Sequence, residues 1–274
     1  MRQSVRRWMF GAGTLAVVAA AACGQAGVAG AAEVTAAGQE GKAAAASPYA
    51  PPAKPLYFGQ HGAAVRSVQR RLAQLHYYPG PIDGKYGNDT LEAAWAFREV
   101  QGLRLNNKSA AQPITRAFEL ALVHPKNPWV LKKNGGASRI EINQNIQVLV
   151  LYRHNRPFLI LHISSGGRYY YPCPGDPKST CGPAVTPDGN YRALSYLPGT
   201  ITVPLGFMKN PVFFIGTAYA IHGGDAVPWY PASHGCVRLY SDVVNWFHKD
   251  VSIGGRHPTP IYIRGTAPEY PASN

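Results

Sequence analysis

Apolar residues at helical spacing predict three helices in the first ordered part of the chain. From Leu56 onwards, apolar positions recur every three or four residues, which places them on one face of a helix. The first such face comprises Val65, Val68, Leu72 and Leu75. A second helix is expected to begin at Asp89, which forms an Asp-x-x-Glu cap with Glu92, and to stop at Gly102. A third is expected over 114–122.

Beyond residue 138 the pattern changes to the alternation that is typical of β-strands. Strands are expected at 139–142, 146–152, 158–164, 189–194, 201–203, 212–215 and 261–263. One short helix is expected over 241–248, from the spacing of Val243, Val244, Trp246 and Phe247. The chain therefore reads as an α+β protein of two domains, a small three-helix bundle over 56–123 and a mostly β domain over 138–265.

The N-terminal segment has the pattern of a secretion signal. Three arginines within the first seven residues precede an apolar run over 8–22, which is short for a membrane span. Two processing routes are open: lipidation of Cys23, or cleavage at the small residues 29–31. We expect a leader over 1–32 and a flexible linker, rich in Ala and Pro, over 33–55. The mature protein is then extracytoplasmic, and a lipid on Cys23 is its one expected link to the membrane.

The chain is strongly basic. Lys and Arg number 27 and Asp and Glu 14, which gives a net charge of +13. This excess favours an anionic partner such as nucleic acid, a membrane surface or the bacterial cell wall. No nucleic-acid-binding motif accompanies the charge, so we expect no nucleic-acid partner. No Cys-x-x-Cys or His-x-x-x-His pair occurs, so we expect no metal, and no other cofactor is expected.

The four cysteines have different expected roles. Cys23 belongs to the leader. Cys173 and Cys181 flank a turn-rich stretch, and in an oxidising compartment a disulfide between them is the natural expectation. Cys236 is left without a partner, which is unusual in an exported protein and supports a reactive role.

Cys236 lies in a cluster of residues that suits nucleophilic catalysis. Ile221-His222-Gly223 is followed by Ser233-His234-Gly235-Cys236-Val237-Arg238-Leu239. A thiol becomes a strong nucleophile as thiolate, and a nearby imidazole or cation promotes that state. Gly235 allows the backbone to approach a substrate closely. The backbone N–H groups of Gly235 and Cys236 are candidate donors to a substrate oxyanion.

Four further residues near this cluster each have two interpretations. His234 either helps to hold the oxyanion or packs to shape the loop. Arg238 either binds a substrate carboxylate through its planar guanidinium or anchors the loop by an internal ion pair. Tyr219 and Trp229 either line the cleft or pack in the core, and core packing is the role we expect.

The helical part resembles the three-helix peptidoglycan-binding domain over about 56–123. The positions that carry the resemblance are Gly62, Val65, Val68-Gln69, Leu72, Leu75, Gly80, Ile82-Asp83-Gly84, Tyr86-Gly87, Thr90, Ala93, Phe97 and Gly102-Leu103. Arg98 stands where that family usually has Gln. The resemblance implies binding to peptidoglycan, with a simple spacer as the alternative.

The β part resembles the L,D-transpeptidase catalytic domain of the YkuD type over about 138–265. The motifs that carry the resemblance are Ser165-Gly166, Thr186-Pro187-Asp188-Gly189-Asn190-Tyr191, Ala220-Ile221-His222-Gly223 and residues 233–239. The resemblance implies Cys236 as nucleophile, His222 as its base and the carbonyl of Gly223 as the group that orients the ring. The expected substrate or oxyanion residues are Ser233, His234, Gly235 and Arg238. The segment between Cys173 and Cys181 departs from the family pattern, and it either shapes a rim of the cleft or braces a loop.

The reaction implied by the resemblance is acyl transfer in two halves. Cys236 attacks a tetrapeptide stem of peptidoglycan, D-alanine leaves, and a thioester remains. An amine of a neighbouring stem then makes a three-to-three cross-link, whereas water as acceptor gives L,D-carboxypeptidase activity. The resemblance also implies acylation by carbapenems. The alternatives are a cysteine endopeptidase of wall peptides and a catalytically silent wall-binding protein.

Overall fold

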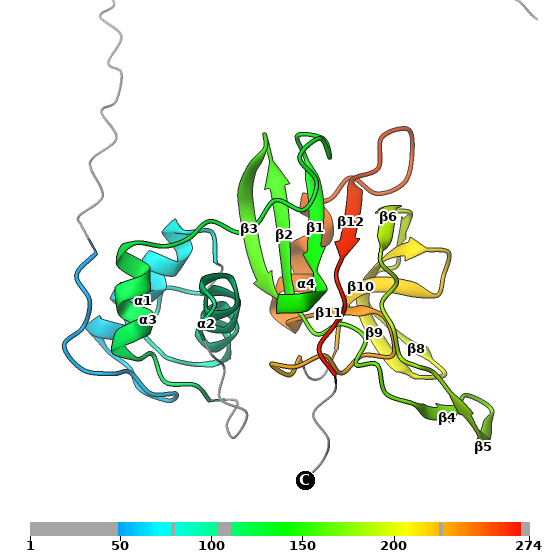
Figure 1. Ribbon diagram of the computed structural model, residues 1–274, viewed down its shortest axis with the longest axis horizontal. Helices are drawn as coiled ribbons and strands as arrows, with labels where there is room; N and C mark the ends of the chain where they lie inside the picture. The colour runs from blue at the N-terminus through cyan, green and yellow to red at the C-terminus, as the bar shows by residue number, and fades with distance from the viewer. Residues whose placement is uncertain (1–48, 78–79, 104–110, 225–226, 270–274) are drawn as a thin grey trace, which may run out of the picture. The chain divides into compact units, whose positions relative to one another are not determined.

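The residues that the computed structural model describes are 49–77, 80–103, 111–224 and 227–269 (Figure 1). The expected leader, with Cys23, and most of the expected linker lie outside these ranges. Within the described ranges, no helix is long and apolar enough to cross a membrane.

Three helices lie in the N-terminal region that the structure describes. They are α1 (Ala63–Gln74), α2 (Asn88–Gln101) and α3 (Arg116–Val123), each close to its expected position. Their apolar faces meet in one core. There the ring of Phe97 lies edge to face with Tyr77 and Phe118, at centroid distances of 5.2 Å and 4.8 Å. Such aromatic pairs bury much apolar area for a region of this size.

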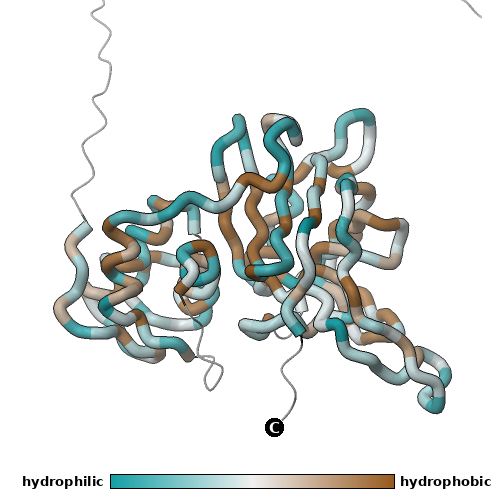
Figure 2. The backbone as a smooth tube through the Cα atoms, in the orientation of Figure 1, coloured by the Kyte–Doolittle hydropathy of each residue, from teal (hydrophilic) through white to brown (hydrophobic). Residues whose placement is uncertain are grey.

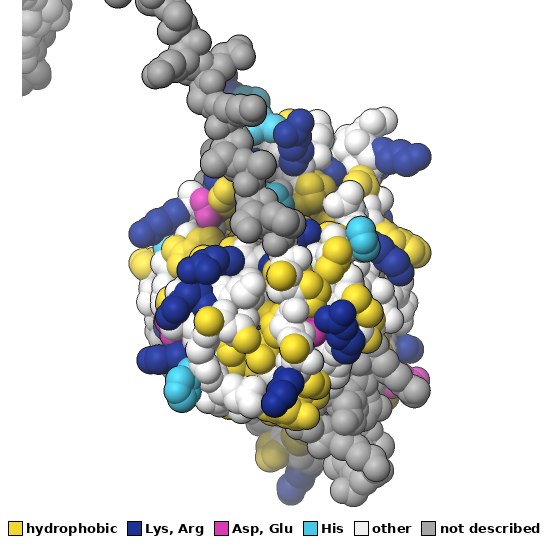
Figure 3. Space-filling model, turned by 90° about the vertical axis from the view of Figure 1, so that its left-hand side faces the viewer, with side chains coloured by type: hydrophobic (Ala, Val, Ile, Leu, Met, Phe, Trp, Pro, Cys, Tyr) yellow, Lys and Arg dark blue, Asp and Glu magenta, His cyan; other side chains and the backbone are white. Residues whose placement is uncertain are grey.

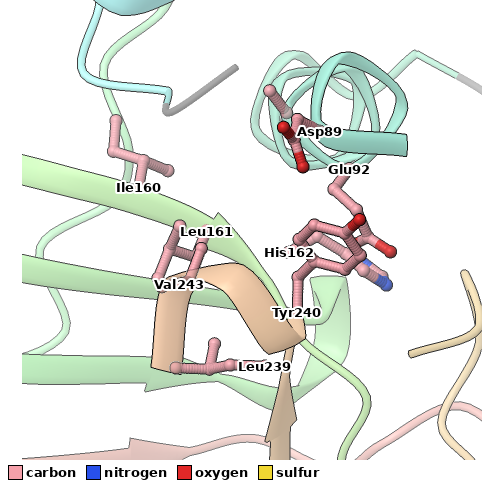
Figure 4. A pocket seen from close by; sticks show the side chains of 9 residues that line it. Asp89, Glu92, Ile160, Leu161, His162, Leu239, Tyr240 and Val243 are labelled. Carbon is pink, nitrogen blue, oxygen red and sulfur yellow. The ribbon is translucent and has the colours of Figure 1, made fainter. Parts of the chain in front are cut away.

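The start of α2 differs from the sequence-based expectation. Gly87 caps this helix, and no side chain bonds to the cap. Asp89 and Glu92 instead line a small cavity against the β-rich region (Figure 4). The expected Asp-x-x-Glu cap is therefore wrong, because tertiary packing of α2 turns both carboxylates away from the helix start.

Two sheets make up most of the C-terminal region that the structure describes. The strands of the first are β1 (Arg139–Asn143), β2 (Val148–Arg153), β3 (Arg156–His162), β6 (Gly189–Arg192) and β12 (Pro260–Arg264). Their order is β3-β2-β1-β12-β6, with β1 and β12 parallel and the other pairs antiparallel.

The second sheet carries the two motif segments. Its strands are β7 (Ser195–Tyr196), β8 (Thr200–Val203), β9 (Gly206–Ile215), β10 (Tyr219–Gly223) and β11 (Val237–Leu239). Their order is β11-β10-β9-β7, and β8 pairs with β9. Outside the sheets lie the hairpin of β4 (Tyr171–Cys173) with β5 (Asp176–Cys181) and the helix α4 (Ser241–Phe247), which agrees with the helix expected over 241–248.

The short strands account for most differences from the expected elements. The pattern did not predict β4, β5, β7, β10 or β11, because segments of two to six residues that are partly polar carry little periodicity. The strand expected over 189–194 ends at Arg192, and the one expected from residue 146 begins at Val148. A 3-10 turn over Gln144–Ile146 precedes β2 and includes the first residue of the expected strand.

Alternating apolar residues form the core of the β-rich region. Ile140 and Ile142 of β1 are fully buried beside their register partners Ile261 and Ile263 of β12. The apolar side chains of α4 join the same buried cluster. Figure 2 shows the hydrophobic residues gathered along β1, β2 and β3. This core holds the second sheet, and with it the motif strands, in place.

The helical and β-rich regions share a hydrophobic core. Tyr77, which follows α1, forms a parallel bridge with Ile160 of β3, and the Ile160 N–H donates to the carbonyl of His76 at 2.8 Å. Val148 and Tyr152 of β2 belong to the same buried cluster as the residues of α2. The helix α2 is therefore packed directly on the first sheet.

Candidate active site

The pairing of β10 with β11 brings the two motif segments together. These strands run parallel, and His222 lies opposite Arg238. Register partners project from the same face of a sheet, so the two side chains lie side by side. His222, Cys236 and Arg238 all line one cleft of about 400 Å³. The structure thus unites the residues that the sequence nominated as base and nucleophile.

One hydrogen bond orients the ring of His222. Its Nδ1 lies 2.7 Å from the carbonyl oxygen of Gly223. A carbonyl can only accept, so Nδ1 carries the hydrogen and Nε2 is left able to take a proton. Burial, assisted by the nearby Arg238 charge, lowers the pKa of His222 to about 4 against the opposing effect of the Gly223 bond. The ring is therefore neutral at pH 7 and competent as a base.

Cys236 is a partly buried free thiol in the described structure. Burial raises the pKa of this thiol, while a backbone hydrogen bond at Ala220 and the charge of Arg238 oppose the rise. The sulfur lies 3.8 Å from the carbonyl oxygen of Ala218. Thiol and imidazole are thus both neutral at rest.

The loop before Cys236 is braced by its own side chain. Ser233 Oγ donates to the carbonyl of Cys236 and accepts the N–H of Gly235 at 3.0 Å. In this structure the Gly235 N–H already has a partner inside the loop, and its donation to a substrate oxyanion stays a prediction. Ser233 lines the cleft, but its hydroxyl holds the loop together.

Only glycine fits at position 235. Its φ is +138°, a conformation that residues with a side chain rarely adopt. An added Cβ would lie 2.6 Å from Cε1 of Tyr219 and 2.8 Å from the carbonyl oxygen of Val185. Thr186 Oγ1 donates to the Gly235 carbonyl at 2.7 Å and fixes the same residue from another side. Tight packing, in addition to the backbone access expected from the sequence, therefore explains this glycine.

His234 lies on the rim of the cleft between two tyrosines. Its ring centroid is 5.5 Å from that of Tyr169 and 4.5 Å from that of Tyr171, both edge to face. Burial, and then the Arg238 charge, lower the pKa of His234. Tyr171 belongs to the β4–β5 hairpin, which the expected disulfide between Cys173 and Cys181 closes. The hairpin therefore forms part of the rim.

The remaining nominated residues are divided between two clefts. Arg238 lines the cleft of Cys236 and has no ion pair with a described carboxylate. Tyr219 lines this cleft and also packs on the core of the β-rich region, so it has both of the roles considered. Trp229 lies in a different groove, against the core that the helices share with the sheet.

The sequence did not identify several residues that line the cleft. The β8–β9 hairpin provides an apolar wall, and the β4–β5 hairpin provides part of the facing rim; the residues concerned are Val203, Pro204, Leu205, Phe207, Met208, Tyr171 and Pro174. The aromatic residues next to Cys173 were the one available signal for the rim. No signal in the sequence indicated the apolar wall, because its residues are of the types that are common in any strand. In the described part of the chain, no group of three or more His, Cys, Asp or Glu could hold a metal ion.

Comparisons with known proteins agree with this geometry. Residues 137–263 match the family model of the L,D-transpeptidase catalytic domain, and residues 61–105 match that of a peptidoglycan-binding domain. The fold is similar to the crystal structure of the L,D-transpeptidase from Xylanimonas cellulosilytica, with 32% sequence identity and a TM-score of 0.66. That similarity covers 78% of this chain and 100% of the other.

A second solved structure is more distant. The L,D-transpeptidase from Stackebrandtia nassauensis is 15% identical, with a TM-score of 0.43, and the match covers 78% of this chain and 96% of that one. No curated protein matches the chain. The 32% identity and the full coverage of the crystallised chain, residues 123–326 of the Xylanimonas protein, show that this chain belongs to the L,D-transpeptidase family. It is an enzyme of the bacterial cell wall with a mostly β catalytic region, a helical peptidoglycan-binding region and an extracytoplasmic site of action.

Proposed function

We propose that Cys236 carries the acyl group in this transpeptidase and that His222 is its base. The Cys236 thiol attacks the carbonyl of the third residue of a tetrapeptide stem while its proton passes to Nε2 of His222. The tetrahedral intermediate collapses, the peptide bond to D-alanine breaks, and His222 gives the proton to the leaving amine. A thioester remains on Cys236. The observation that supports this sequence most directly is the 2.7 Å bond from His222 Nδ1 to Gly223, which leaves Nε2 as the proton acceptor.

The other cleft residues have roles that follow from which of their donor or charged groups have no partner among the described residues. The backbone N–H of Cys236 is our candidate for the oxyanion donor, with the half-buried His234 beside it. Arg238 has no described carboxylate partner, which supports binding of a stem carboxylate through its guanidinium. Gly223 positions the base, and Ser233 and Gly235 hold the loop.

The second half of the reaction transfers the thioester to an amine of a neighbouring stem. His222 then removes a proton from the attacking amine and returns it to the sulfur, and a three-to-three cross-link forms. Both stems would bind in the cleft of about 400 Å³ that Cys236 and His222 line. With water as acceptor the same residues would give an L,D-carboxypeptidase, which we keep as the second candidate.

Mass spectrometry of the intact protein tests this assignment. Wild type and Cys236→Ala are incubated with imipenem and, separately, with a disaccharide-tetrapeptide. We expect a drug adduct and a cross-linked dimer with wild type alone. A tripeptide product without dimer would replace the transpeptidase proposal with the carboxypeptidase. An adduct on Cys236→Ala would exclude Cys236 as the nucleophile.

We also propose that the three helices form a bundle that holds the enzyme on peptidoglycan. On the face of this region seen in Figure 3, Lys and Arg side chains surround hydrophobic ones, and few acidic side chains are visible. The exposed apolar residues of the region include Tyr57, Phe58 and Leu120. Aromatic and cationic groups together suit a sugar polymer that carries carboxylates.

Sedimentation with purified sacculi tests the wall-binding role. Replacing Tyr57, Phe58 and Leu120 by Ser is expected to reduce binding several-fold and to leave imipenem acylation unchanged. Equal sedimentation of variant and wild type would exclude this surface as the site of wall binding.

Labelling of exported protein with a radioactive fatty acid, with Cys23→Ala as control, tests whether a lipid anchors the enzyme.

A further inference from the structure

A buried side-chain pair joins the helical region to the catalytic region. Nδ1 of His162, at the end of β3, lies 2.8 Å and 3.1 Å from the two carboxyl oxygens of Glu99 on α2. The side chain of His162 is fully buried, and that of Glu99 is 6% exposed. The edge of the Trp95 ring packs against the imidazole at a centroid distance of 5.1 Å. Such a pair is costly to bury unless both groups are fully hydrogen-bonded.

The other ring nitrogen of His162 reaches toward the active site. Its Nε2 lies 3.0 Å from the carbonyl oxygen of Pro228. This carbonyl can only accept, so Nε2 carries a hydrogen. Burial raises the pKa of Glu99 well above its usual value and lowers the pKa of His162. The consistent state is then neutral: the Glu99 carboxylic acid donates to Nδ1, and Nε2–H donates to Pro228.

Pro228 lies at the start of the segment that leads to the nucleophile. Along this segment, Ser164 Oγ donates to the carbonyl of Tyr230 at 2.8 Å and accepts the N–H of Ala232 at 2.9 Å. Ser233 then bonds to Ser165 and Gly167 through the backbone. The end of β3 and the chain that follows it therefore hold residues 228–233 through successive hydrogen bonds. The bond from His162 to Pro228 is the first of them.

The last residue held in this way, Ser233, is bonded to the loop of Cys236. Ser233, through its hydroxyl, bonds to Gly235 and to the carbonyl of Cys236. Pro228 thus lies five residues before Ser233, whose side chain holds the Cys236 loop. We therefore expect a shift at Pro228 to reach this loop. Small displacements of a nucleophile cost large factors in rate, so the first anchor has consequences for catalysis.

Two other carboxyl groups face the pair, but the hydrogen bonds of the His162 ring go to Glu99 and Pro228. Figure 4 shows Asp89 and Glu92 of α2 facing His162 and Tyr240, around a cavity of about 10 Å³. Oε2 of Glu92 has no hydrogen-bond partner among the described residues. The cavity has room for about one water and none for a ligand. Glu99 is therefore the group that orients the His162 ring.

We propose that Glu99 and His162 are positioning residues for acyl transfer, through which packing of the helical region holds the Pro228–Ser233 segment and so the loop of Cys236. The proposal rests on Cys236 being the nucleophile. It gives the helical region a role in catalysis that is separate from its binding to the wall. Removal of the Glu99 hydrogen bond should therefore slow acylation without weakening the binding of the acylating agent.

The kinetics of imipenem acylation test the proposal in the full chain. We expect Glu99→Leu to reduce the acylation rate at saturating imipenem by about tenfold or more, with the half-saturating concentration changed less than twofold. Glu99→Gln should restore most of the rate, because its amide N–H can donate to Nδ1 as the protonated acid does. The matched control is Glu119→Leu, which removes another buried carboxylate of the helical region, on α3. It should destabilise the helices and leave the rate unchanged.

Hydrogen exchange gives a readout that does not depend on activity. Peptides covering 227–236 should exchange faster in Glu99→Leu than in wild type, and not in Glu119→Leu. If Glu99→Leu does not fold, His162→Phe removes the bond to Glu99 together with the bond to Pro228 and is compared in the same way. Equal rates in wild type and Glu99→Leu, or equal losses in Glu99→Leu and Glu119→Leu, would overturn the proposal. A wild type that imipenem does not acylate at Cys236 would instead overturn the proposed function.

Discussion

Nδ1 of His222 lies 2.7 Å from the carbonyl oxygen of Gly223, the residue next to it in the chain. This bond takes the place that a carboxylate has in a Ser-His-Asp triad, but it brings no negative charge. A carbonyl fixes the tautomer and the ring orientation and stabilises an imidazolium less than a carboxylate would. As a base, His222 is therefore weak, in agreement with a pKa lowered by burial to about 4.

The pH dependence of acylation follows from this weak base. His222 is neutral at all pH values above about 4, and burial keeps the Cys236 thiol protonated through neutrality. We expect the rate of imipenem acylation to be nearly constant from about pH 5 to pH 8 and to fall only near pH 4. In His222→Asn the rate should be far lower and should rise about tenfold per pH unit with the thiolate fraction. An inflection near pH 6.5 in wild type would show that the base has an ordinary pKa.

Gly235→Ala tests the packing behind the nucleophile. The new Cβ meets Tyr219 and the carbonyl of Val185 at 2.6 Å and 2.8 Å, on a backbone with φ of +138°. Backbone strain of this kind costs roughly 1–3 kcal/mol, and the forced shift of the loop should reduce acylation by about a hundredfold. The control is Gly199→Ala, which has positive φ with no atom within 4 Å of the new Cβ. It should lose stability and keep its rate; a rate in Gly235→Ala equal to that of the control would contradict the packing argument.

Tyr171→Ala tests the contribution of the disulfide-closed hairpin to the cleft. The Tyr171 ring contacts His234 edge to face, at a centroid distance of 4.5 Å. Since an aromatic pair contributes roughly 0.5–1.5 kcal/mol, its loss should reduce acylation by about two- to tenfold. Tyr170→Ala removes the neighbouring ring, which is 67% exposed, and should have no effect. If both variants react at the rate of wild type, the hairpin only braces the loop.

Stability should fall with rising pH because of Glu92. Burial raises the pKa of this carboxyl from 4.5 to about 8, with Glu99 and Asp89 adding to the rise and His162 opposing it. The folded protein then binds the proton more tightly than the unfolded chain does. This contribution to stability is complete below about pH 4.5 and is lost as the pH rises towards 8.

Thermal unfolding of Glu92→Gln measures this contribution. Between pH 5 and pH 8 the midpoint of wild type should fall by several degrees more than that of the variant, since roughly 2–4 °C corresponds to 1 kcal/mol in a protein of this size. Glu269→Gln, at an exposed carboxylate, should follow wild type. Parallel curves for wild type and Glu92→Gln would mean that the Glu92 carboxyl is not held protonated.

The local pattern predicted the elements that are long and periodic. The helices α1, α2 and α3 and the strands β1, β2 and β3 were expected close to where they lie, because each buries one face over several turns or residues. The strands β10 and β11 were not expected, although they carry the motifs. They are short, and the parallel pairing of β11 with β10 joins two segments that a long loop separates in the sequence.

The sequence by itself nominated the residues that we propose for the chemistry of this enzyme. Cys236 was singled out by its residue type and by the histidines, glycines and arginine around it, and the resemblance to the L,D-transpeptidase family gave His222 its expected role as base. Tertiary structure alone decided what each neighbour does, because hydrogen-bond partners come from elements far apart in the chain. It brought the Thr186 hydroxyl to the carbonyl of Gly235. It also turned Asp89 and Glu92 from an expected helix cap into a buried cluster, where Glu99 meets His162.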